Sequence, residues 1–564
     1  MASPVSLPSV STDAVPARLP WHAAAWPHTV LVASLSVALF LVYERAYFDG
    51  IRSSDGANYA TVARNVASGR GLVSSVIQPG LIDVVPTDRS GQVFVIQAPA
   101  WPLLLAAAFR LGGANESTLL IVSGTLFVLL MVATWWLAIL WVGSVHWAYA
   151  AWAFLITNPY VIGTALAGAN VLLQSLLLVA IFLACGAAPR VWNVLLVGLL
   201  LGIACVTREN SALAFPAIAL MWHQHLSARV MGGRRRASLL FLTSAADRNR
   251  LVVALAVVGI LASVPIWMEA SRKAGAIGHA DAPVLRMTFL YYTSIADLGW
   301  YYLYHHPMLA VDPKAFFREH PGELLGKMVF QFRVLFLRET VPAMLSFLPF
   351  FVPVLAPRLA PTARGRRGIW ATLVFVAAQV VVGAMTFLNF TYFFAFVPMI
   401  VTGITATAAG LLPIAAGAGR SVMHWGYRGL FAYALAPLFI NVALLASGER
   451  PGTGDYHLSP AAERALSDFI GRHTEATSVI ACSHSALMAW DTGRTILMYS
   501  GHPRYTIGDT PMWRAVDSRV RIDYILLNSF AYETPERTLL PGFRLVASAP
   551  LAGEGEAWLF GRRP

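Results

Sequence analysis

Residues 118–142 read TLLIVSGTLFVLLMVATWWLAILWV, 25 residues without a charged side chain. A helix of about 20 apolar residues is long enough to cross the hydrocarbon core of a bilayer. The rest of the 564-residue chain has the same character, because 57% of its residues are hydrophobic and only 12% are charged. A soluble domain carries about twice that charged fraction. The sequence therefore predicts an all-α, polytopic membrane protein.

Eleven apolar stretches are long enough to be transmembrane helices. They are residues 27–47, 118–142, 147–166, 169–187, 191–207, 210–226, 251–269, 341–356, 369–388, 391–412 and 429–447. A twelfth stretch, 98–111, is shorter, carries Pro99 and Pro102, and ends beside Arg110. We interpret it as a re-entrant or interfacial helix.

The formal charge of +12 is concentrated in short connections between these stretches. With eleven spans and the N-terminus inside, the arginine-rich connections all face the cytoplasm, as the positive-inside rule expects. These arginines are Arg190, Arg229, Arg234, Arg235, Arg236, Arg248, Arg250, Arg358, Arg364, Arg366, Arg367, Arg420 and Arg428. A twelfth span would reverse the side of every cluster. The positive charge is therefore explained by the membrane topology. No nucleic-acid-binding module is recognisable in the sequence.

This topology predicts three domains or segments. Residues 1–26 form a cytoplasmic N-terminal segment without the features of a signal peptide. Residues 27–447 form the transmembrane domain, with long external loops at 48–117 and 270–340. Residues 448–564 form an extracytoplasmic domain. The expected location is a bacterial inner membrane, with the functional site facing the periplasm or exterior.

The C-terminal segment alternates helical and strand-like patterns, which indicates a small soluble α/β domain. Ser459 followed by Pro460 is a typical helix start and predicts a helix of about 13 residues. Strand-like runs follow at 477–482, 495–499, 524–528 and 558–561. The three cysteines suggest no disulfide framework, and no residue cluster indicates a metal, although a divalent ion is compatible with the chemistry below.

Candidate catalytic groups gather at the predicted external ends of the spans. Asp55 lies near the start of an amphipathic helix in the first loop, Thr207-Arg208-Glu209 follows the fifth span, and Arg272 and Lys273 begin the second loop, which ends near Arg333 and Arg338. A carboxylate can act as general base for an incoming hydroxyl or amine, while fixed cations hold a phosphate leaving group. This combination suits displacement at a sugar carbon attached to a lipid phosphate.

Each group also has a purely structural interpretation. Asp55 before Gly56 could cap a surface helix, Arg208 and Glu209 could pair with each other, and the basic residues could anchor lipid headgroups. Tyr59, Tyr301 and Tyr302 could line a sugar or lipid groove, or could simply pack in the core or at the headgroup level.

Three motifs resemble the GT-C glycosyltransferases. Residues 55–71 (DGANYATVARNVASGRG) and 97–106 (QAPAWPLLLA) are similar to the first external loop of that family, and 198–208 (GLLLGIACVTR) to its glycine-patterned helix. The branch in question contains the dolichyl-phosphate-mannose protein mannosyltransferases and the bacterial lipid A aminoarabinose transferases. The resemblance covers about the first 220 residues well, and the remainder in layout.

The resemblance implies an inverting transferase that uses an undecaprenyl- or similar polyprenyl-phosphate sugar and a lipid, glycan or protein acceptor. Asp55 would be the catalytic carboxylate and Arg208 would lie near the lipid phosphate, with Arg272, Lys273 and Arg338 as further phosphate or headgroup contacts. Many relatives carry a second acidic residue where this chain has Asn170, which with Glu209 could line the groove. A second carboxylate would then have to come from Asp49, Asp83, Asp88 or Glu269.

Two other function classes fit a polytopic chain: a polyprenyl-lipid flippase or secondary transporter, and a non-catalytic scaffold. Carriers tend to have ionisable residues within their spans and inverted repeats. The charges of this chain lie at the ends of the spans, which favours the enzyme.

Overall fold

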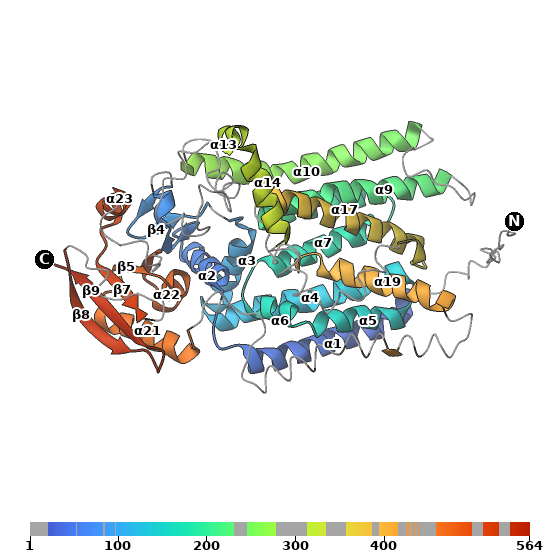
Figure 1. The fold of residues 1–564 in the computed structure, drawn as a ribbon. Helices are drawn as coiled ribbons and strands as arrows, with labels where there is room; N and C mark the ends of the chain where they lie inside the picture. The colour runs from blue at the N-terminus through green and yellow to red at the C-terminus, as the bar shows by residue number, and fades with distance from the viewer. Residues whose placement is uncertain are drawn as a thin grey trace.

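A computed structural model describes residues 21–51, 53–82, 85–95, 97–230, 245–277, 313–333, 357–385, 394–415, 458–498, 511–529 and 542–563, with isolated positions between 425 and 439. Helices occupy the predicted apolar stretches in these ranges (Figure 1). They are α1 (Trp21–Tyr47), α4 (Glu116–Val142), α5 (Val145–Ile156), α6 (Pro159–Leu166), α7 (Val171–Cys185), α8 (Val191–Thr207), α9 (Ala214–Val230), α10 (Ala245–Ile277), α17 (Ala363–Met385) and α19 (Val397–Ala415). The predicted spans at 341–356 and 429–447 lie outside the described residues, apart from the isolated positions.

Four of these helices are long and apolar enough to cross a membrane, namely α1, α4, α10 and α17. Helices α5, α7, α8 and α19 are apolar but shorter. The predicted span at 147–166 is divided into α5 and α6 because Pro159 lacks the backbone N–H that would continue α5. The predicted span at 210–226 begins with a short 3₁₀ turn, η2 (Glu209–Leu213), before α9. The all-α polytopic prediction is confirmed.

Glycines on α8 allow α10 to pack closely against it. A Cβ atom on Gly198 would lie 2.9 Å from the Leu261 side chain, and one on Gly202 would lie 2.9 Å from Pro265. Small residues four apart are a common means of close helix approach in membranes. The glycine pattern therefore allows the middle of α10 to pack closely against the middle of α8.

The first loop contains two helices, α2 (Ser54–Ala67) and α3 (Ala100–Gly112), and a short 3₁₀ turn, η1 (Pro79–Leu81). Its small antiparallel sheet has the order β1 (Val73–Ser74), β4 (Gly91–Val93), β3 (Thr87–Asp88). At 13 residues α3 is too short to span a bilayer. Trp101 and Phe109 are buried on one face while Leu111 is 92% exposed. This one-sided burial agrees with the interfacial interpretation of 98–111.

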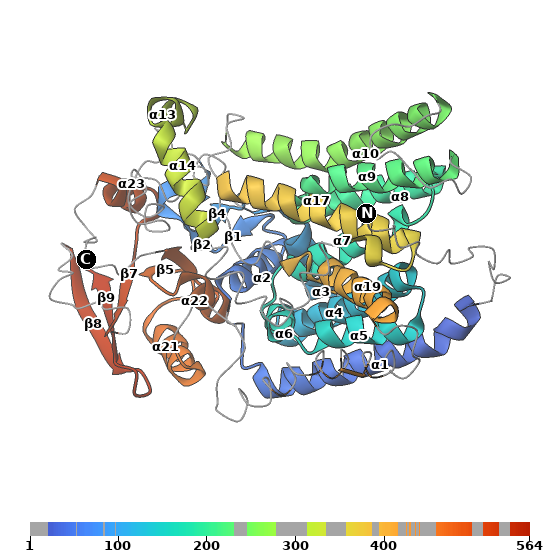
Figure 2. The same cartoon turned by 45° about the vertical axis from the view of Figure 1, so that its right-hand side comes forward.

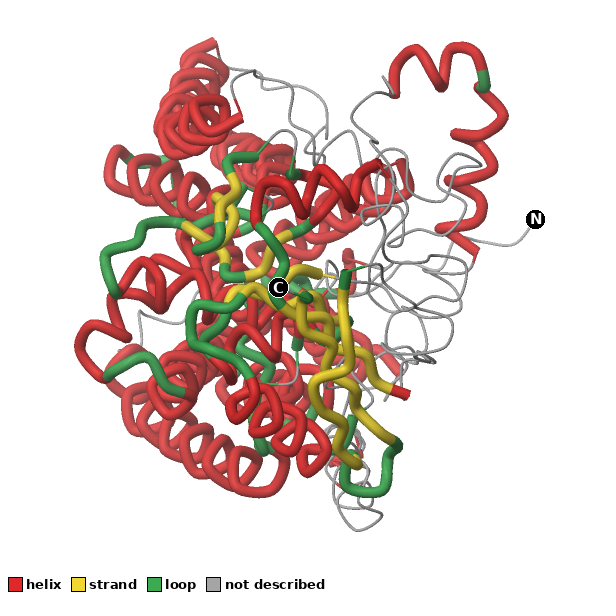
Figure 3. The backbone as a smooth tube through the Cα atoms, turned by 90° about the vertical axis from the view of Figure 1, so that its left-hand side faces the viewer, coloured by secondary structure: helices red, strands yellow, loops and turns green. Residues whose placement is uncertain are grey.

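The C-terminal segment forms an α/β layer at one end of the helical bundle (Figures 2 and 3). Its helices are α21 (Pro460–His473), α22 (Ser485–Thr492) and α23 (Pro511–Val520). Ser459 caps α21 as predicted, since its Oγ accepts a hydrogen bond from the Ala462 amide at 3.2 Å. Strands β5 (Val479–Cys482), β6 (Thr495–Met498), β7 (Tyr524–Asn528) and β9 (Glu556–Arg562) match the predicted runs.

Two strands of this sheet were not predicted from the sequence. Strand β8 (Phe543–Pro550) pairs antiparallel with β9 at one edge. At the other edge lies β2 (Val76–Ile77), a strand of the first loop, which pairs parallel with β6. The six-stranded order is β2-β6-β5-β7-β9-β8. The first loop and the C-terminal segment thus share one sheet.

Further along the chain, α13 (Pro313–Glu319) and α14 (Pro321–Phe330) are the described helices of the second long loop, and η8 (Pro357–Leu359) precedes α17. The side chain of Gln331, just after α14, is buried and donates a hydrogen bond to the Ala384 carbonyl near the end of α17 at 2.9 Å. This contact ties the described part of the second loop to the bundle.

Candidate functional site

Asp55 lies in the first turn of α2. Ser53 caps this helix by accepting a hydrogen bond from the Gly56 amide at 3.2 Å, so Asp55 is not needed as the cap. Its carboxylate is exposed, and Oδ1 accepts a hydrogen bond of 2.9 Å from Gln97 Nε2. Gln97 begins the second of the first-loop motifs, so the structure brings both motifs together at one carboxylate.

Gly56 places this end of α2 against the bundle. A Cβ atom on Gly56 would lie 1.9 Å from the Ala167 carbonyl oxygen, in the connection between α6 and α7. A little further along that connection, the buried Asn170 side chain donates to the Thr207 carbonyl at 2.9 Å. These contacts connect Asp55 through the start of α7 to the end of α8, where Arg208 follows.

Two cations and two carboxylates cluster where α8 ends and α10 passes. Lys273 Nζ lies 2.8 Å from Glu209 Oε1 and 3.6 Å from Glu269 Oε1. Arg272 forms a two-pronged pair with Glu269, at 2.8 Å from Nε and 2.7 Å from Nη2. Arg208 is half-buried in extended backbone at the end of α8. The expected cations therefore lie together at this end of the bundle, but Arg272 and Lys273 already have carboxylate partners.

The remaining predicted site residues have different surroundings. Tyr59 is only 3% exposed, and its ring packs edge-on against Phe94 with centroids 6.3 Å apart. Arg333 is exposed after α14. Arg338, Tyr301 and Tyr302 lie outside the described residues.

A network of neutral amide side chains, next to the Glu209–Lys273 ion pair, was not predicted from the sequence. Gln174 Nε2 donates to Asn210 Oδ1 at 2.8 Å and to Ser211 Oγ at 2.9 Å, and Asn210 Nδ2 lies 3.3 Å from Gln379 Oε1. Buried polar groups need partners in an apolar environment, so this network joins α7, η2 and α17. The signal in the sequence was a polar side chain inside each apolar stretch.

Other residues of the 55–71 motif form hydrogen bonds from α2 to β1 and to α22. Asn58 Oδ1 accepts from Ser74 Oγ at 2.7 Å, and Asn65 Nδ2 donates to the Val73 carbonyl at 2.8 Å. Arg64 donates to the carbonyls of Ala489 at 2.8 Å and Trp490 at 2.9 Å, in the last turn of α22. Burial lowers the pKa of the Arg64 guanidinium. A cation at a helix C-terminus is stabilised by the helix dipole.

Trp490 occupies the centre of this contact between α2 and α22. The Arg64 guanidinium carbon lies 5.1 Å from the centroid of its ring, and the Phe109 ring of α3 stacks on it with centroids 6.0 Å apart. Both helices of the first loop therefore touch the same side chain of the C-terminal segment.

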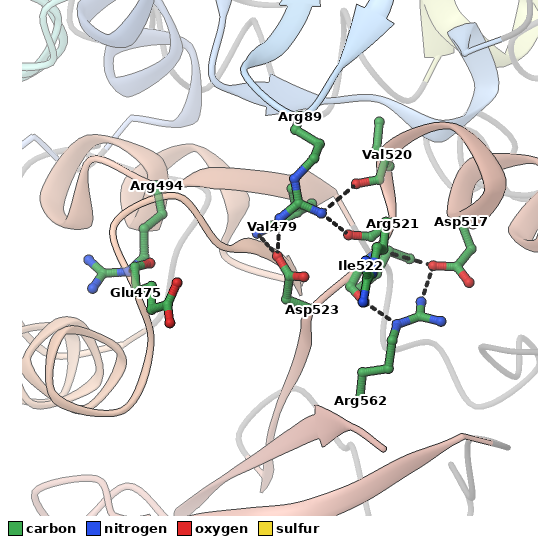
Figure 4. A network of polar contacts seen from close by, with 10 residues as sticks. All are labelled: Arg89, Glu475, Val479, Arg494, Asp517, Val520, Arg521, Ile522, Asp523 and Arg562. Atoms are coloured by element: carbon green, nitrogen blue, oxygen red, sulfur yellow. Dashed lines mark hydrogen bonds and ion pairs between the residues drawn. The ribbon is translucent and has the colours of Figure 1, made fainter. Parts of the chain in front are cut away.

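A second polar network joins the first loop to the sheet (Figure 4). Arg89 forms an ion pair of 2.6 Å with Asp523 Oδ2 and donates to the Arg521 carbonyl at 3.0 Å. The same Asp523 oxygen accepts from the Val479 amide at 2.9 Å. Arg562 also contacts Asp517 and the Ile522 carbonyl. The loop that carries Asp55 is thus fixed to the sheet at both β2 and Arg89.

The predicted cytoplasmic arginines lie at the other end of the bundle, as far as the described residues reach. Helix α4 starts beside the first loop, where Glu116 accepts from the Ile51 amide at 3.2 Å, and ends at Val142. At that far end, Thr362 donates to the Trp141 carbonyl at 2.5 Å, next to Arg364 and Arg366. Among the described residues, no group of three or more His, Cys, Asp or Glu side chains could hold a metal ion.

A bundle of apolar helices, an interfacial first loop and an α/β layer at one end define the GT-C class of membrane fold. Two solved structures of ArnT from Cupriavidus metallidurans share it over 95% of this chain and 98% of theirs. The TM-score is 0.56 at 12% identity for the structure bound to undecaprenyl phosphate, and 0.57 at 13% identity for the apo structure. No family model matches the sequence, and neither does any curated protein. The similarity confirms the predicted fold.

Proposed function

We propose that this protein is a membrane glycosyltransferase that moves a sugar from a polyprenyl-phosphate donor to a hydroxyl or amine on a lipid, glycan or protein. The observation that carries the proposal is the exposed Asp55 carboxylate, held by Gln97 at the same end of the bundle as Arg208, Arg272 and Lys273. The fold adds support, because one ArnT structure with this fold is bound to undecaprenyl phosphate.

In the proposed reaction Asp55 removes the proton of the acceptor hydroxyl or amine as that group attacks the anomeric carbon. The bond from this carbon to the phosphate oxygen breaks, the configuration inverts, and polyprenyl phosphate leaves. Arg208 and Lys273 would stabilise the negative charge that develops on the leaving phosphate. Glu209 is 67% exposed whereas Lys273 is 17% exposed, so water can solvate the Glu209 carboxylate when a phosphate replaces it beside Lys273.

The same proposal places this end of the bundle outside the cytoplasm. The arginines near α17 and before α8 lie at the opposite end, which the positive-inside rule assigns to the cytoplasm. An inner membrane with a periplasmic site would satisfy both observations.

The test has two stages. Mass spectrometry of lipids from a deletion strain should reveal an accumulated polyprenyl-linked sugar. Purified protein in nanodiscs should then transfer that sugar to an extract of the strain's envelope. Asp55→Asn should reduce transfer by at least a hundredfold, the usual contribution of a general base, while donor binding persists. Asp468→Asn, on the exposed face of α21, is the matched control. Wild-type transfer by Asp55→Asn would exclude this base, and flipping of the lipid without transfer would support a carrier instead.

A further inference from the structure

A groove of about 430 Å³ runs between α1 and α4. Its walls are apolar, and their side chains are partly open to the surroundings: Val37 is 45% exposed, Leu41 54%, Ile121 69% and Leu129 48%. Both helices are long and apolar enough to cross a membrane. Because such helices meet lipid tails on their outer surfaces, the groove would lie within the hydrocarbon region.

Small residues on α4 make room for the groove. Ser117 and Gly124 are seven residues apart and therefore on the same face of the helix. At Gly124 a Cβ atom would lie 2.6 Å from the Phe40 ring of α1. The ring fills the space that a larger side chain would take and forms part of the groove lining. The shape of the groove is thus determined by the close packing of Phe40 against Gly124.

One end of the groove is polar. Glu44, in the last turn of α1, and Ser117, at the start of α4, line that end. Neither side chain has a hydrogen bond or ion pair with any other residue of the chain's described part. The neighbouring Arg45 points about 100° away from Glu44 around the helix and does not line the groove. Within the described residues, the groove therefore ends in a carboxylate without a cation partner and a hydroxyl without a hydrogen-bond partner.

We propose that this groove binds a phospholipid whose headgroup carries a primary ammonium, with one acyl chain along the apolar walls. The Glu44 carboxylate would accept a hydrogen bond from the ammonium, and the Ser117 hydroxyl would donate to the adjacent phosphate. A polyprenyl phosphate fits this end poorly, because it would bring a second negative charge to Glu44, and no cation is among the described residues that line the groove. The site is also remote from Lys273, since α1 and α10 lie on opposite sides of the bundle (Figures 1 and 2).

The headgroup must supply the selectivity. In a bilayer a lipid tail gains little by leaving other tails for an apolar groove, since the two surroundings are equally apolar. A hydrogen bond between an ammonium and a carboxylate is stronger than a neutral one. The groove should therefore distinguish lipids by their headgroups when their acyl chains are identical.

Native mass spectrometry of the full-length, delipidated protein tests this proposal. The probes are dioleoyl phosphatidylethanolamine, phosphatidylcholine and phosphatidylglycerol. One phosphatidylethanolamine should bind about tenfold more tightly than phosphatidylglycerol, the effect of one hydrogen bond to a charged group. Glu44→Gln should reduce the difference to about twofold, and Glu44→Lys should invert it. Asp247→Asn, near the start of α10 and away from the groove, is the matched control and should keep the wild-type preference.

A second variant separates the groove from general effects on folding. Ser117→Phe should fill the polar end and lower the binding of all three lipids, while the melting temperature in detergent stays close to that of the wild type. Equal binding of the three lipids by the wild type would overturn the proposal, as would an unchanged preference in Glu44→Lys. Neither outcome bears on the transfer reaction, because the variants lie outside the proposed catalytic groups.

Discussion

Gln97 Nε2 donates a hydrogen bond to Asp55 Oδ1 across 2.9 Å and so joins two motifs of the first loop. The amide carries no charge, and it fixes the direction of the carboxylate without neutralising it. Gln97 also lies between β4, which pairs with β1 and β3, and α3, which packs against α4 and α8. The carboxylate is therefore oriented by an uncharged partner at an exposed position.

Gln97→Met should lower the rate of transfer without preventing folding. The substitution keeps the length of the side chain but removes the donor, and a hydrogen bond to a charged group contributes about 1.5–3 kcal/mol. If this orientation matters only in the transition state, kcat should fall by about tenfold or more while KM changes little. Steady-state kinetics in nanodiscs measure both. An unchanged kcat would show that Asp55 needs no such partner.

Gly56→Ala should destabilise the contact between α2 and the bundle. The added methyl would lie 1.9 Å from the backbone oxygen of Ala167, and a backbone cannot move aside as a flexible side chain can. Overpacking of this kind costs about 1–3 kcal/mol. Thermal unfolding in detergent should show a lower melting temperature.

Gly471→Ala is the matched control for that substitution. Gly471 lies in the last turns of α21 with no atom within 4 Å of an added Cβ. Alanine is a better helix former than glycine, so this variant should be as stable as the wild type or slightly more so. Equal melting temperatures for Gly56→Ala and the wild type would contradict the close approach.

Local patterns in the sequence correctly predicted the helices and strands whose ends carry characteristic residues. Helix α8 has the predicted bounds of 191–207, because Arg190 and Arg208 bracket its apolar residues. Helix α21 begins after Ser459 because serine and proline are both suited to a helix start. Strand β7 also has its predicted bounds, since its run of apolar residues is buried.

Contacts between distant segments could not be predicted in this way. Strand β2 has only two residues, too few for any alternating pattern, and its partner β6 lies in the C-terminal segment. Strand β8 is largely exposed, so its sequence lacks the alternation of a half-buried strand. Asp55 was predicted as a candidate from its place in the 55–71 motif of the first loop, but its partner Gln97 is 42 residues away. Likewise, nothing in the 55–71 motif indicated that Arg64 contacts α22.

Arg64→Met should loosen the first loop from the C-terminal segment. Methionine keeps the aliphatic stem but removes both hydrogen bonds to the last turn of α22. Hydrogen exchange should become faster in both α2 and α22. Arg64→Lys should restore this protection only in part, because a lysine lacks the planar fork that contacts two carbonyls. Equal exchange in Arg64→Met and the wild type would show that β2 and Arg89 hold the loop without it.

Asp491 follows Trp490 and should make this contact sensitive to pH. The side chain keeps contact with solvent, but packing of the surrounding chain, and secondarily the nearby Glu116, raises the pKa of its carboxyl from 3.8 to about 7, whereas Arg64 opposes the shift. Between pH 4 and pH 7 the folded protein then holds a proton that the unfolded chain has lost. Stability contributed by Asp491 is therefore greatest at low pH and declines as the pH rises through this window.

Asp491→Asn should remove that decline, because the amide resembles the protonated carboxyl at every pH. Melting temperatures measured from pH 4 to pH 8 should show a flatter profile for the variant, with its largest gain over the wild type at and above pH 7. Asp468→Asn, on an exposed face of α21, should follow the wild-type profile. Because Asp491 lies beside the side chain that both first-loop helices touch, hydrogen exchange of α2 should show the same pH dependence in the wild type and lose it in Asp491→Asn. Parallel profiles for Asp491→Asn and the wild type would exclude Asp491 as the titrating group.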